Sequence, residues 1–385
     1  MVPFIDLKRF EDGFLERWSA KVASMTEKTE FIGGNEVTIL EKRLSEFVQV
    51  AHTVSCANGT DAIQLALRAI GVGRGDLVLV PNMTFWATFE AVVNVGASPV
   101  TVDIDITDGG IDLAALTEAV AKYKPKAAVI AHLYGWGSAN LKSIREYCRQ
   151  NEVLLVEDGA QCFGVEVDGE PIYKDALVST TSFYPAKVLG AAGDGGAVFT
   201  NNAELAAVVR QLGNHGRTAH YGYCAVGWNS RLDSLQAAFL NISLDYLPQR
   251  LASRREAVDY YKSSLTSIGI TQMLAPADYL ENGYCNVCLI DDLEKKANLE
   301  SALKSAGIGF GNIYPGVMSV QPGAKNYLHA HVGRDQAEKL CRSVINLPLF
   351  PYMTPTELAE VTQVLNIIFS GDSDEQSKRI YSPNS

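Results

Sequence analysis

The stretch VLLVEDGAQ, residues 153–161, decides the fold. Its first four residues are apolar without alternation, which is typical of a strand buried on both faces of a sheet. Similar apolar runs lie at residues 78–80, 99–102 and 127–130. Amphipathic segments lie before, between and after them, at residues 62–70, 89–95, 113–123 and 141–150. Alternating strands and helices predict an α/β fold with a mostly parallel sheet between helices.

The pattern changes twice further along the chain. Residues 179–200 contain two β-type runs joined by a glycine-rich connection, so we expect a mixed sheet. The later segments predict a smaller α+β domain. They are a polar helix at 247–264, a strand at 284–290 and helices at 293–306 and 355–369. We expect a large cofactor-binding domain at 1–245, with residues 1–30 able to pack on a small domain at 246–370, and a polar tail at 371–385.

Bulk properties exclude several classes of protein. The 385 residues are 47% hydrophobic and carry a formal net charge of -11, which argues against a nonspecific nucleic-acid or anionic-membrane binder. No apolar run approaches the ~20 residues that span a bilayer, and no secretory signal pattern is present, so we expect a cytoplasmic protein. Seven scattered cysteines suit reduced thiols better than a disulfide framework.

Lys187 is the residue with the most unusual setting. It lies in SFYPAKVLG, residues 182–190, between an apolar strand and a glycine-rich run. Burial there would lower its pKa and give a neutral amine. Because a neutral lysine amine condenses with aldehydes, this stretch predicts Schiff-base chemistry.

Pyridoxal phosphate is an aldehyde cofactor whose pyridine nitrogen needs a buried carboxylate. Asp158, directly after the apolar run at 153–156, lies where ligands bind in open α/β sheets. Alone it would more often cap a turn, but a lysine at a neighbouring strand end favours the cofactor role. Gln161 could donate a hydrogen bond to the cofactor's ring oxygen.

The cofactor's phosphate and ring face also have candidate partners. Gly59 lets the backbone approach a phosphate, and the amides of Thr60 and Asp61 would start a helix. Asn58 or Thr60 as a plain helix cap is compatible with this role. Ser182 is a second phosphate donor, and Phe85 or Trp86 could stack on the ring, although such an aromatic pair is usually core.

These segments, in this order and spacing, resemble the DegT/DnrJ-type sugar aminotransferases, which are pyridoxal phosphate enzymes of fold type I. The matching stretches are residues 31–37, 58–62, 157–161, 182–187, 193–196, 214–216 and 228–233. The resemblance implies a large domain with a mostly parallel seven-stranded sheet, and a smaller C-terminal domain. It implies a Schiff base at Lys187, a contact of Asp158 with the pyridine nitrogen and one of Gln161 with the ring oxygen.

The same resemblance implies that Gly59, Thr60 and Ser182 hold the phosphate and that Phe85 stacks on the ring. It further implies that Asn229 reaches the phosphate bound by a partner subunit, so the working unit would be a homodimer.

Two positions depart from the family, and they concern the ring and the sugar. Gly159 stands where relatives often have alanine, an exchange we expect to be silent. Asn312 replaces a histidine found in many relatives, in a segment with Tyr314 that lines the sugar side of the pocket there. Further candidates for substrate contacts are His215 and Arg217, although loop residues of these types are more often solvated.

No metal site is expected. Cys285 and Cys288 have zinc-type spacing without a second pair, and strand alternation would point them to opposite faces. His329 and His331 are an isolated pair in a loop-like stretch.

The leading interpretation is an aminotransferase that moves an amino group from L-glutamate to a keto-sugar, with a nucleotide-linked keto-deoxysugar as the expected acceptor. Such an enzyme would serve the biosynthesis of amino sugars, for lipopolysaccharide or other polysaccharides or for glycosylated metabolites. One alternative is a sugar dehydratase on the same fold, but those relatives replace the lysine by histidine. The other is a regulatory protein that lost activity, which should have eroded Lys187 or Asp158 first.

Overall fold

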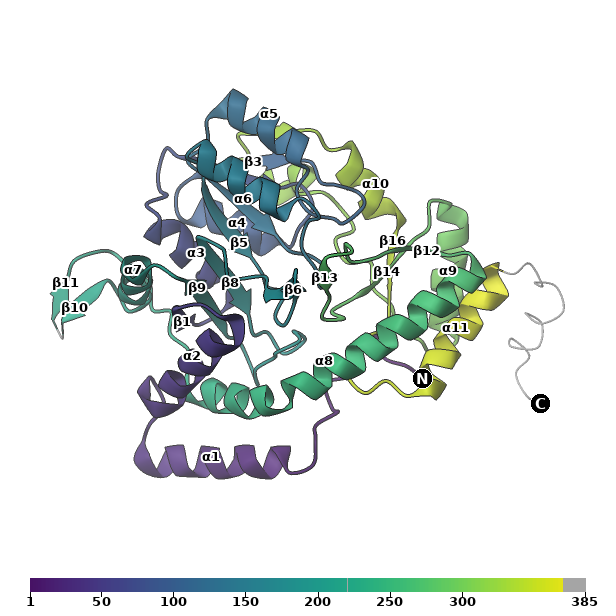
Figure 1. Cartoon of the computed structure of the whole chain (residues 1–385), viewed down its shortest axis with the longest axis horizontal. Coiled ribbons are helices and arrows are strands. Elements are labelled where there is room, and N and C mark those ends of the chain that lie inside the picture. Colours follow the sequence, from purple (N-terminus) through teal and green to yellow (C-terminus); the bar gives the residue numbers. More distant parts are fainter. Residues whose placement is uncertain (220, 370–385) are drawn as a thin grey trace.

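The computed structural model describes residues 1–219 and 221–369, and a mostly parallel sheet occupies the centre of its large layered part (Figure 1). The sheet has eight strands in the order β1-β9-β8-β5-β4-β2-β3-β15. They are β1 (His52–Cys56), β2 (Leu77–Pro81), β3 (Ser98–Val102), β4 (Ala127–Ala131), β5 (Leu154–Asp158), β8 (Val178–Ser182), β9 (Gly196–Thr200) and β15 (Ala330–Val332). Only β9 runs antiparallel to its neighbours β1 and β8, so the expected mixed sheet is confirmed.

The prediction of seven strands is wrong by one. Residues 329–331, expected to form a loop, contribute to β15, which pairs in parallel with β3 at the sheet edge. A three-residue strand has too few positions to show a hydrophobic period, and it is held by pairing with a distant part of the chain.

Helices cover both faces of the sheet. They are α2 (Gly34–Val48), α3 (Gly59–Ala69), α4 (Trp86–Asn94), α5 (Leu113–Tyr123), α6 (Leu141–Gln150) and α7 (Ala203–Gly213). Leu79 of β2 packs in one core cluster with residues of α2, α5 and α6, whereas Val78 and Val80 pack in another with α3, α4 and α7. Each strand therefore buries alternate side chains on opposite faces, which explains the unbroken apolar runs.

A second, smaller layer is built from later residues, on the right in Figure 1. Its antiparallel sheet has the order β12-β14-β16, and the helices α9, α10 and α11 pack near it. The elements are β12 (Thr271–Met273), β14 (Asn286–Leu289), β16 (Val344–Leu347), α9 (Leu293–Ser305), α10 (Asp335–Ser343) and α11 (Pro355–Phe369).

The helix α8 (Ser234–Ile268) joins the two layers as one 35-residue element. It is longer than the expected helix at 247–264 and continues through the proposed domain boundary at 245/246. Its early residues Leu240 and Leu244 belong to the core of the large sheet, and its later residues Tyr261 and Leu265 to the core of the smaller layer. The division into two domains remains a prediction, and the polar tail at 371–385 lies outside the described residues.

The N-terminal residues touch both layers. Val2 bridges to Ile308 in the smaller layer, and α1 (Phe14–Lys28) lies along the early part of α8, where the rings of Phe14 and Phe239 are 4.9 Å apart. The remaining short elements are β6 (Glu166–Val167), β7 (Glu170–Pro171), β10 (Arg217–Ala219), β11 (Gly222–Tyr223), β13 (Tyr279–Leu280) and two 3₁₀ turns at Met318–Val320 and Pro322–Ala324.

All seven cysteines are free thiols, and Cys285 and Cys288 belong to different core clusters. None of the helices in residues 1–219 and 221–369 has both the length and the apolar character needed to cross a bilayer.

Candidate active site

One cavity of about 590 Å³ collects most of the predicted site residues. It lies at the carboxyl ends of the parallel strands, because these ends meet at one edge of the sheet. The predicted residues that line it are Gly59, Thr60, Phe85, Asp158, Gln161, Ser182, Lys187 and Tyr314. Residues from five separate parts of the chain therefore converge on a single hollow.

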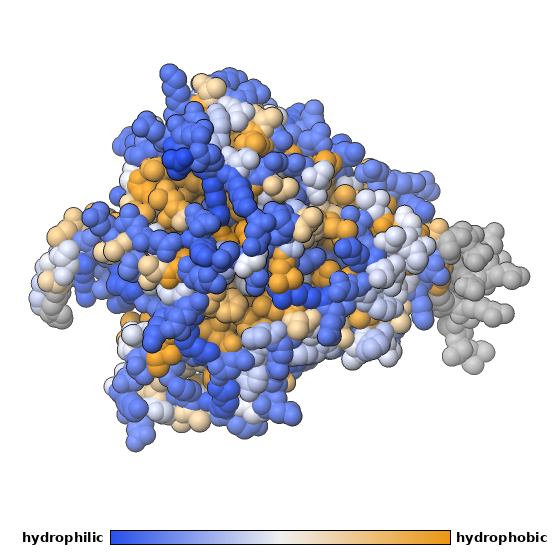
Figure 2. All heavy atoms as spheres, in the orientation of Figure 1, coloured by the Kyte–Doolittle hydropathy of each residue, from blue (hydrophilic) through white to orange (hydrophobic). Residues whose placement is uncertain are grey.

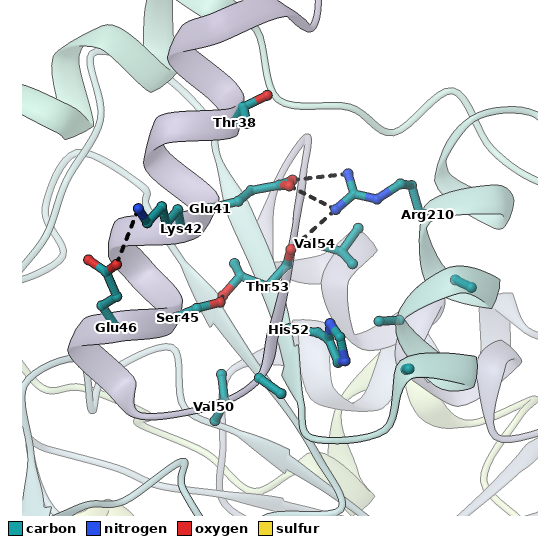
Figure 3. Close-up of a pocket in the computed structure, with 14 residues that line it drawn as sticks. Thr38, Glu41, Lys42, Ser45, Glu46, Val50, His52, Thr53, Val54 and Arg210 are labelled. Atoms are coloured by element: carbon teal, nitrogen blue, oxygen red, sulfur yellow. Dashed lines mark hydrogen bonds and ion pairs between the residues drawn. The ribbon is translucent and has the colours of Figure 1, made fainter.

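A larger hollow, about 700 Å³, lies between α2 and α7 over the edge strand β1 (Figure 3). Its acidic and basic side chains are already paired: Arg210 with Glu41, and Lys42 with Glu46. It contains neither Lys187 nor Asp158, so the chemistry belongs to the smaller cavity.

Lys187 stands in the connection between β8 and β9. Its amine Nζ is 3.3 Å from the hydroxyl of Tyr284 and 5.0 Å from the centre of that ring. The side chain is half-buried, not enclosed as the sequence led us to expect. Gly190 allows the tight turn of this connection, because a β carbon there would lie 2.4 Å from the carbonyl oxygen of Pro185.

Asp158 ends β5 and is 7% exposed. Its Oδ2 accepts a hydrogen bond from the hydroxyl of Thr88 at 2.9 Å, and its Oδ1 accepts one from the amide of Ala160 at 3.1 Å. Within the described residues no lysine, arginine or histidine forms an ion pair with it. A buried carboxylate that has only neutral donors is suited to a positively charged group from outside the chain.

The predicted phosphate residues form a compact cradle. Asn58 is the N-cap of α3, and its Oδ1 accepts from the amide of Asp61 at 2.8 Å. A β carbon on Gly59 would lie 2.7 Å from Cβ of Ser182, so only glycine fits this close approach. The helix start and Ser182 thus lie against each other at the positive end of the helix dipole, where an anion is favoured.

The aromatic pair divides between the cavity and the core. Phe85 precedes α4 and is 61% exposed, at the cavity wall. Trp86 instead stacks on Phe89, with ring centres 4.9 Å apart. An exposed phenyl ring beside Asp158 and the cradle is available to cover a flat ligand ring.

Gln161 and Tyr314 are linked to each other. The Nε2 of Gln161 donates to the hydroxyl of Tyr314 at 2.5 Å, and its Oε1 accepts from the amide of Tyr134 at 2.6 Å. Burial raises the pKa of Tyr314 well above its usual value, so this hydroxyl remains protonated.

Four other predicted residues lie outside this cavity's wall. Asn312 donates to Oε1 of Glu300 at 2.9 Å, and the guanidinium of Arg217 lies over the ring of Tyr223. His215, near Arg217, adopts a positive φ of 62° before the β10–β11 hairpin. Asn229 is exposed, and its side chain accepts from Nη2 of Arg231 at 2.7 Å. The predicted roles of these four residues in binding substrate or cofactor remain predictions.

Sequence reasoning missed several residues of the wall. His132 follows β4, and its Nε2 is 2.9 Å from Oε2 of Glu157. Burial raises the pKa of Glu157, but His132 and Arg145 outweigh this and lower it overall, so the carboxylate is charged. A polar residue directly after the apolar run 127–131 was the available signal for His132.

For other residues that line the cavity, no nearby sequence pattern predicts a place in the site. Tyr284 and the N-terminal residues Phe4 and Ile5 reach the cavity from segments far from the lysine in sequence. Thr88 of α4 lies behind this wall; its hydroxyl donates to Asp158 and also contacts the hydroxyl of Thr84, which precedes the helix.

Comparisons with known proteins agree with this arrangement. Residues 15–366 match the model of the DegT/DnrJ/EryC1/StrS aminotransferase family. The chain is 36% identical over 366 residues to UDP-2-acetamido-2-deoxy-3-oxo-D-glucuronate aminotransferase of Pseudomonas aeruginosa, covering 95% of this chain and 99% of that protein.

Two further relatives are similar in length and fold. UDP-N-acetyl-3-dehydro-alpha-D-glucosamine 3-aminotransferase of Acidithiobacillus ferrooxidans is 34% identical over 375 residues, covering 96% of this chain and 98% of that protein. The crystal structure of NtdA from Bacillus subtilis with bound cofactor PMP superposes with a TM-score of 0.88 at 27% identity, covering 96% of this chain and 85% of that chain.

Proposed function

The chain belongs to the DegT/DnrJ/EryC1/StrS aminotransferase family, and we propose that it transfers the amino group of L-glutamate to a nucleotide-linked keto-sugar with pyridoxal phosphate as its cofactor. The observation that carries the proposal is the shared cavity: a lysine amine, a buried carboxylate that pairs with no cation of the described residues, and a glycine–serine cradle at a helix start. PMP, bound in the Bacillus subtilis relative, is the amine form of the same cofactor.

The residues present fit this cofactor. Gly59, Thr60 and Ser182 would hold the phosphate, Asp158 would keep the pyridine nitrogen protonated, and Phe85 would cover the ring. When bound, the cofactor supplies an electron-accepting ring that stabilises negative charge at the reacting carbon.

The chain's own residues would then handle the proton. The Nζ of Lys187 removes the proton from the substrate carbon that bears nitrogen and returns one in the reverse half of the cycle. Tyr284, 3.3 Å from Nζ, orients the free amine. Thr88 and the amide of Ala160 hold the carboxylate of Asp158 in place, where it would accept the hydrogen bond of the cofactor's ring nitrogen.

We infer that the acceptor is a UDP-linked 2-acetamido sugar with its ketone at C3. The support is that the names of the two sugar aminotransferases above specify UDP, an N-acetyl or acetamido group and a 3-oxo or 3-dehydro carbon. We further propose a homodimer in which Asn229 of each subunit completes the other subunit's phosphate site. Its exposed position outside the wall of its own cavity supports this.

The test follows the cofactor's visible absorbance. Purified protein with pyridoxal phosphate should be yellow, L-glutamate should bleach it, and a UDP-linked 3-keto sugar should restore the colour. Lys187→Ala should lose the visible band, whereas Asp158→Ala should bind cofactor and lose most turnover. Protein that stays colourless with the cofactor would refute the hypothesis that the chain is a pyridoxal phosphate enzyme. Bleaching by other amino acids but not by glutamate would refute glutamate as the amino donor. Restoration by dTDP-linked or 4-keto sugars alone would refute the acceptor.

A further inference from the structure

A second cavity of about 350 Å³ adjoins the site and shares Lys187 and Ile5 with it. Its walls come from the N-terminal segment, the lysine connection and one side of α8. This volume is in the range of small-molecule sites, about 300–1,000 Å³. The proposed cycle assigns nothing to it.

Arg254 of α8 lines this second cavity, and none of the described residues serves as its counter-ion. It is 5% exposed, and its Nη1 donates to the carbonyl oxygens of Gly283 at 3.0 Å and Leu349 at 3.4 Å. Its buried Nε has no hydrogen-bond partner in the described part of the chain. Burial lowers its pKa to about 10, which still leaves it charged at neutral pH. A buried charge without a partner is costly, so a ligand anion is the natural complement.

The acids around the cavity are already engaged. Both carboxylate oxygens of Glu11 accept from Arg250, at 2.7 and 2.6 Å, and Tyr352 donates to one of them. Asp6 accepts from Nε of Arg9 at 2.9 Å. Among the residues that the structure describes, no carboxylate pairs with Arg254.

Arg254 is connected to the amine of Lys187 through two neighbouring residues, Gly283 and Tyr284. It holds the carbonyl of Gly283, and the next residue, Tyr284, places its hydroxyl 3.3 Å from Nζ of Lys187. In an amino acid the α-carboxylate is attached to the same carbon that carries nitrogen. A donor whose reacting carbon is at Lys187 therefore needs a cation close to that lysine, and the net charge of -11 does not supply one at long range.

We propose that Arg254 binds a carboxylate of the amino donor in this second cavity. The proposal rests on the proposed function, because it assumes that an amino acid delivers the nitrogen at Lys187. An arginine–carboxylate contact out of water, with a planar fork of donors, is among the stronger hydrogen-bonded pairs.

The experiment compares Arg254→Gln with Arg255→Gln. Arg255 is the neighbour on α8, and it also donates to backbone carbonyls, those of Glu281 at 2.7 Å and Gly164 at 3.2 Å. It lies outside the cavity at Lys187, so its variant controls for the loss of a partly buried arginine.

Two measurements are made on the holoenzyme. The first is calorimetric binding of glutarate, a dicarboxylate that has no amine and cannot react. The second is bleaching by L-glutamate without any sugar. Arg254→Gln should weaken glutarate binding and raise the half-saturating glutamate concentration about 10- to 100-fold, while Arg255→Gln should stay near wild type.

Each other outcome is decisive. If Arg254→Gln fails to fold, Arg254→Lys, which keeps the charge and one donor group but loses the fork, should raise the glutamate requirement several-fold in folded protein that still shows the cofactor's visible band. Equal glutamate responses in the variants at 254 and 255 would overturn the proposal. A change confined to the half-reaction with the sugar would overturn it too, by assigning the anion to the acceptor. Wild-type enzyme that ignores glutamate would instead refute the proposed donor.

Discussion

Gly159 lies next to the carboxylate Asp158, and the structure leaves little room there for the β carbon of any larger residue. The sequence suggests that alanine would be equivalent there, but a β carbon would lie 2.3 Å from Cε1 of Tyr173, which is buried. The hydroxyl of Tyr173 also donates to the carbonyl oxygen of Gly159 at 2.7 Å. This close approach argues against a silent exchange in this chain.

We predict that Gly159→Ala lowers the free energy of unfolding by about 1–3 kcal/mol, because overpacking forces the ring or the backbone to move. Replacing Tyr173 by alanine removes the obstacle, so the double variant should be destabilised by less than the sum of the two single changes. Chemical denaturation of the four proteins measures this coupling. Additive effects would show that the ring and the glycine do not compete for space.

Glu281 gives a pH dependence at the residue scale. Burial raises the pKa of its carboxyl from 4.5 to about 7. Below about pH 4.5 both folded and unfolded chains are protonated there. As the pH rises toward 7 the unfolded chain loses its proton first, so the free energy of unfolding falls. Over this window Glu281 costs at most roughly 3 kcal/mol.

Glu281→Gln should remove this slope, so that the variant is more stable than wild type at pH 8 and similar to it at pH 4.5. Urea denaturation across this range measures the difference, with the exposed Glu256→Gln as the control for losing one negative charge. Parallel pH profiles for wild type and Glu281→Gln would contradict the prediction.

At the scale of elements, the edge strand β1 is protected by side chains from two helices. Oε1 of Glu41 accepts from the amide of Ser55 at 2.9 Å and from its hydroxyl at 2.8 Å (Figure 3 shows Glu41 beside the strand). Arg210 bridges from α7 to Glu41 and to the carbonyl oxygen of Thr53. In the hollow between α2 and α7, these side chains thus occupy the backbone groups at the edge of the sheet, which blocks strand pairing with another chain.

We predict that Glu41→Ala costs about 1–3 kcal/mol, because it leaves a strand amide and an arginine without their partner, and that it promotes aggregation. The matched control is Glu46→Ala on the same helix. Glu46 pairs with Lys42 at 3.8 Å, both being exposed, so its loss should be near neutral. Melting temperature and light scattering on heating would report both effects. Equal behaviour of the two variants would mean that the edge needs no protection.

At the scale of the whole molecule, the active site is open to a partner. Large apolar side chains are exposed along the N-terminal part and around the cavity, among them Leu15, Phe31, Ile32, Phe85 and Tyr184, and Figure 2 shows hydrophobic residues reaching the surface in several places. Such exposure is typical of an interface, in agreement with the proposed homodimer.

The dimer proposal predicts complementation between two damaged chains. Lys187→Ala and Asn229→Ala homodimers should each be impaired, but co-expressed hybrids should regain activity, because one of the two sites then has the lysine of one subunit and the asparagine of the other. Hybrids isolated with two affinity tags provide the measurement. Hybrids no more active than the mixed parents would show that Asn229 serves its own subunit or none.

Much of the fold was predictable from the sequence because its signals are local. The strands β2, β3, β4 and β5 are marked in the sequence by short unbroken apolar runs and the helices between them by amphipathic periodicity, and their bounds were predicted closely. The candidate site was partly predictable for a related reason. Asp158 follows an apolar run, whereas Ser182 and the start of α3 follow shorter β-type stretches, and the strand ends of the sheet bring these positions together.

The sequence by itself determined which chemical groups meet at the strand ends: a lysine, a carboxylate and a helix start at one edge of a mostly parallel sheet. These groups also indicated the family and the cofactor. Only the tertiary structure decided the eighth strand, the single helix α8, the contact of Lys187 with Tyr284 and, within residues 1–219 and 221–369, the absence of a carboxylate paired with Arg254. The reason is physical. These features depend on which groups from distant segments fill the same space, as with Lys187 and Tyr284, 97 residues apart, and no local period records that.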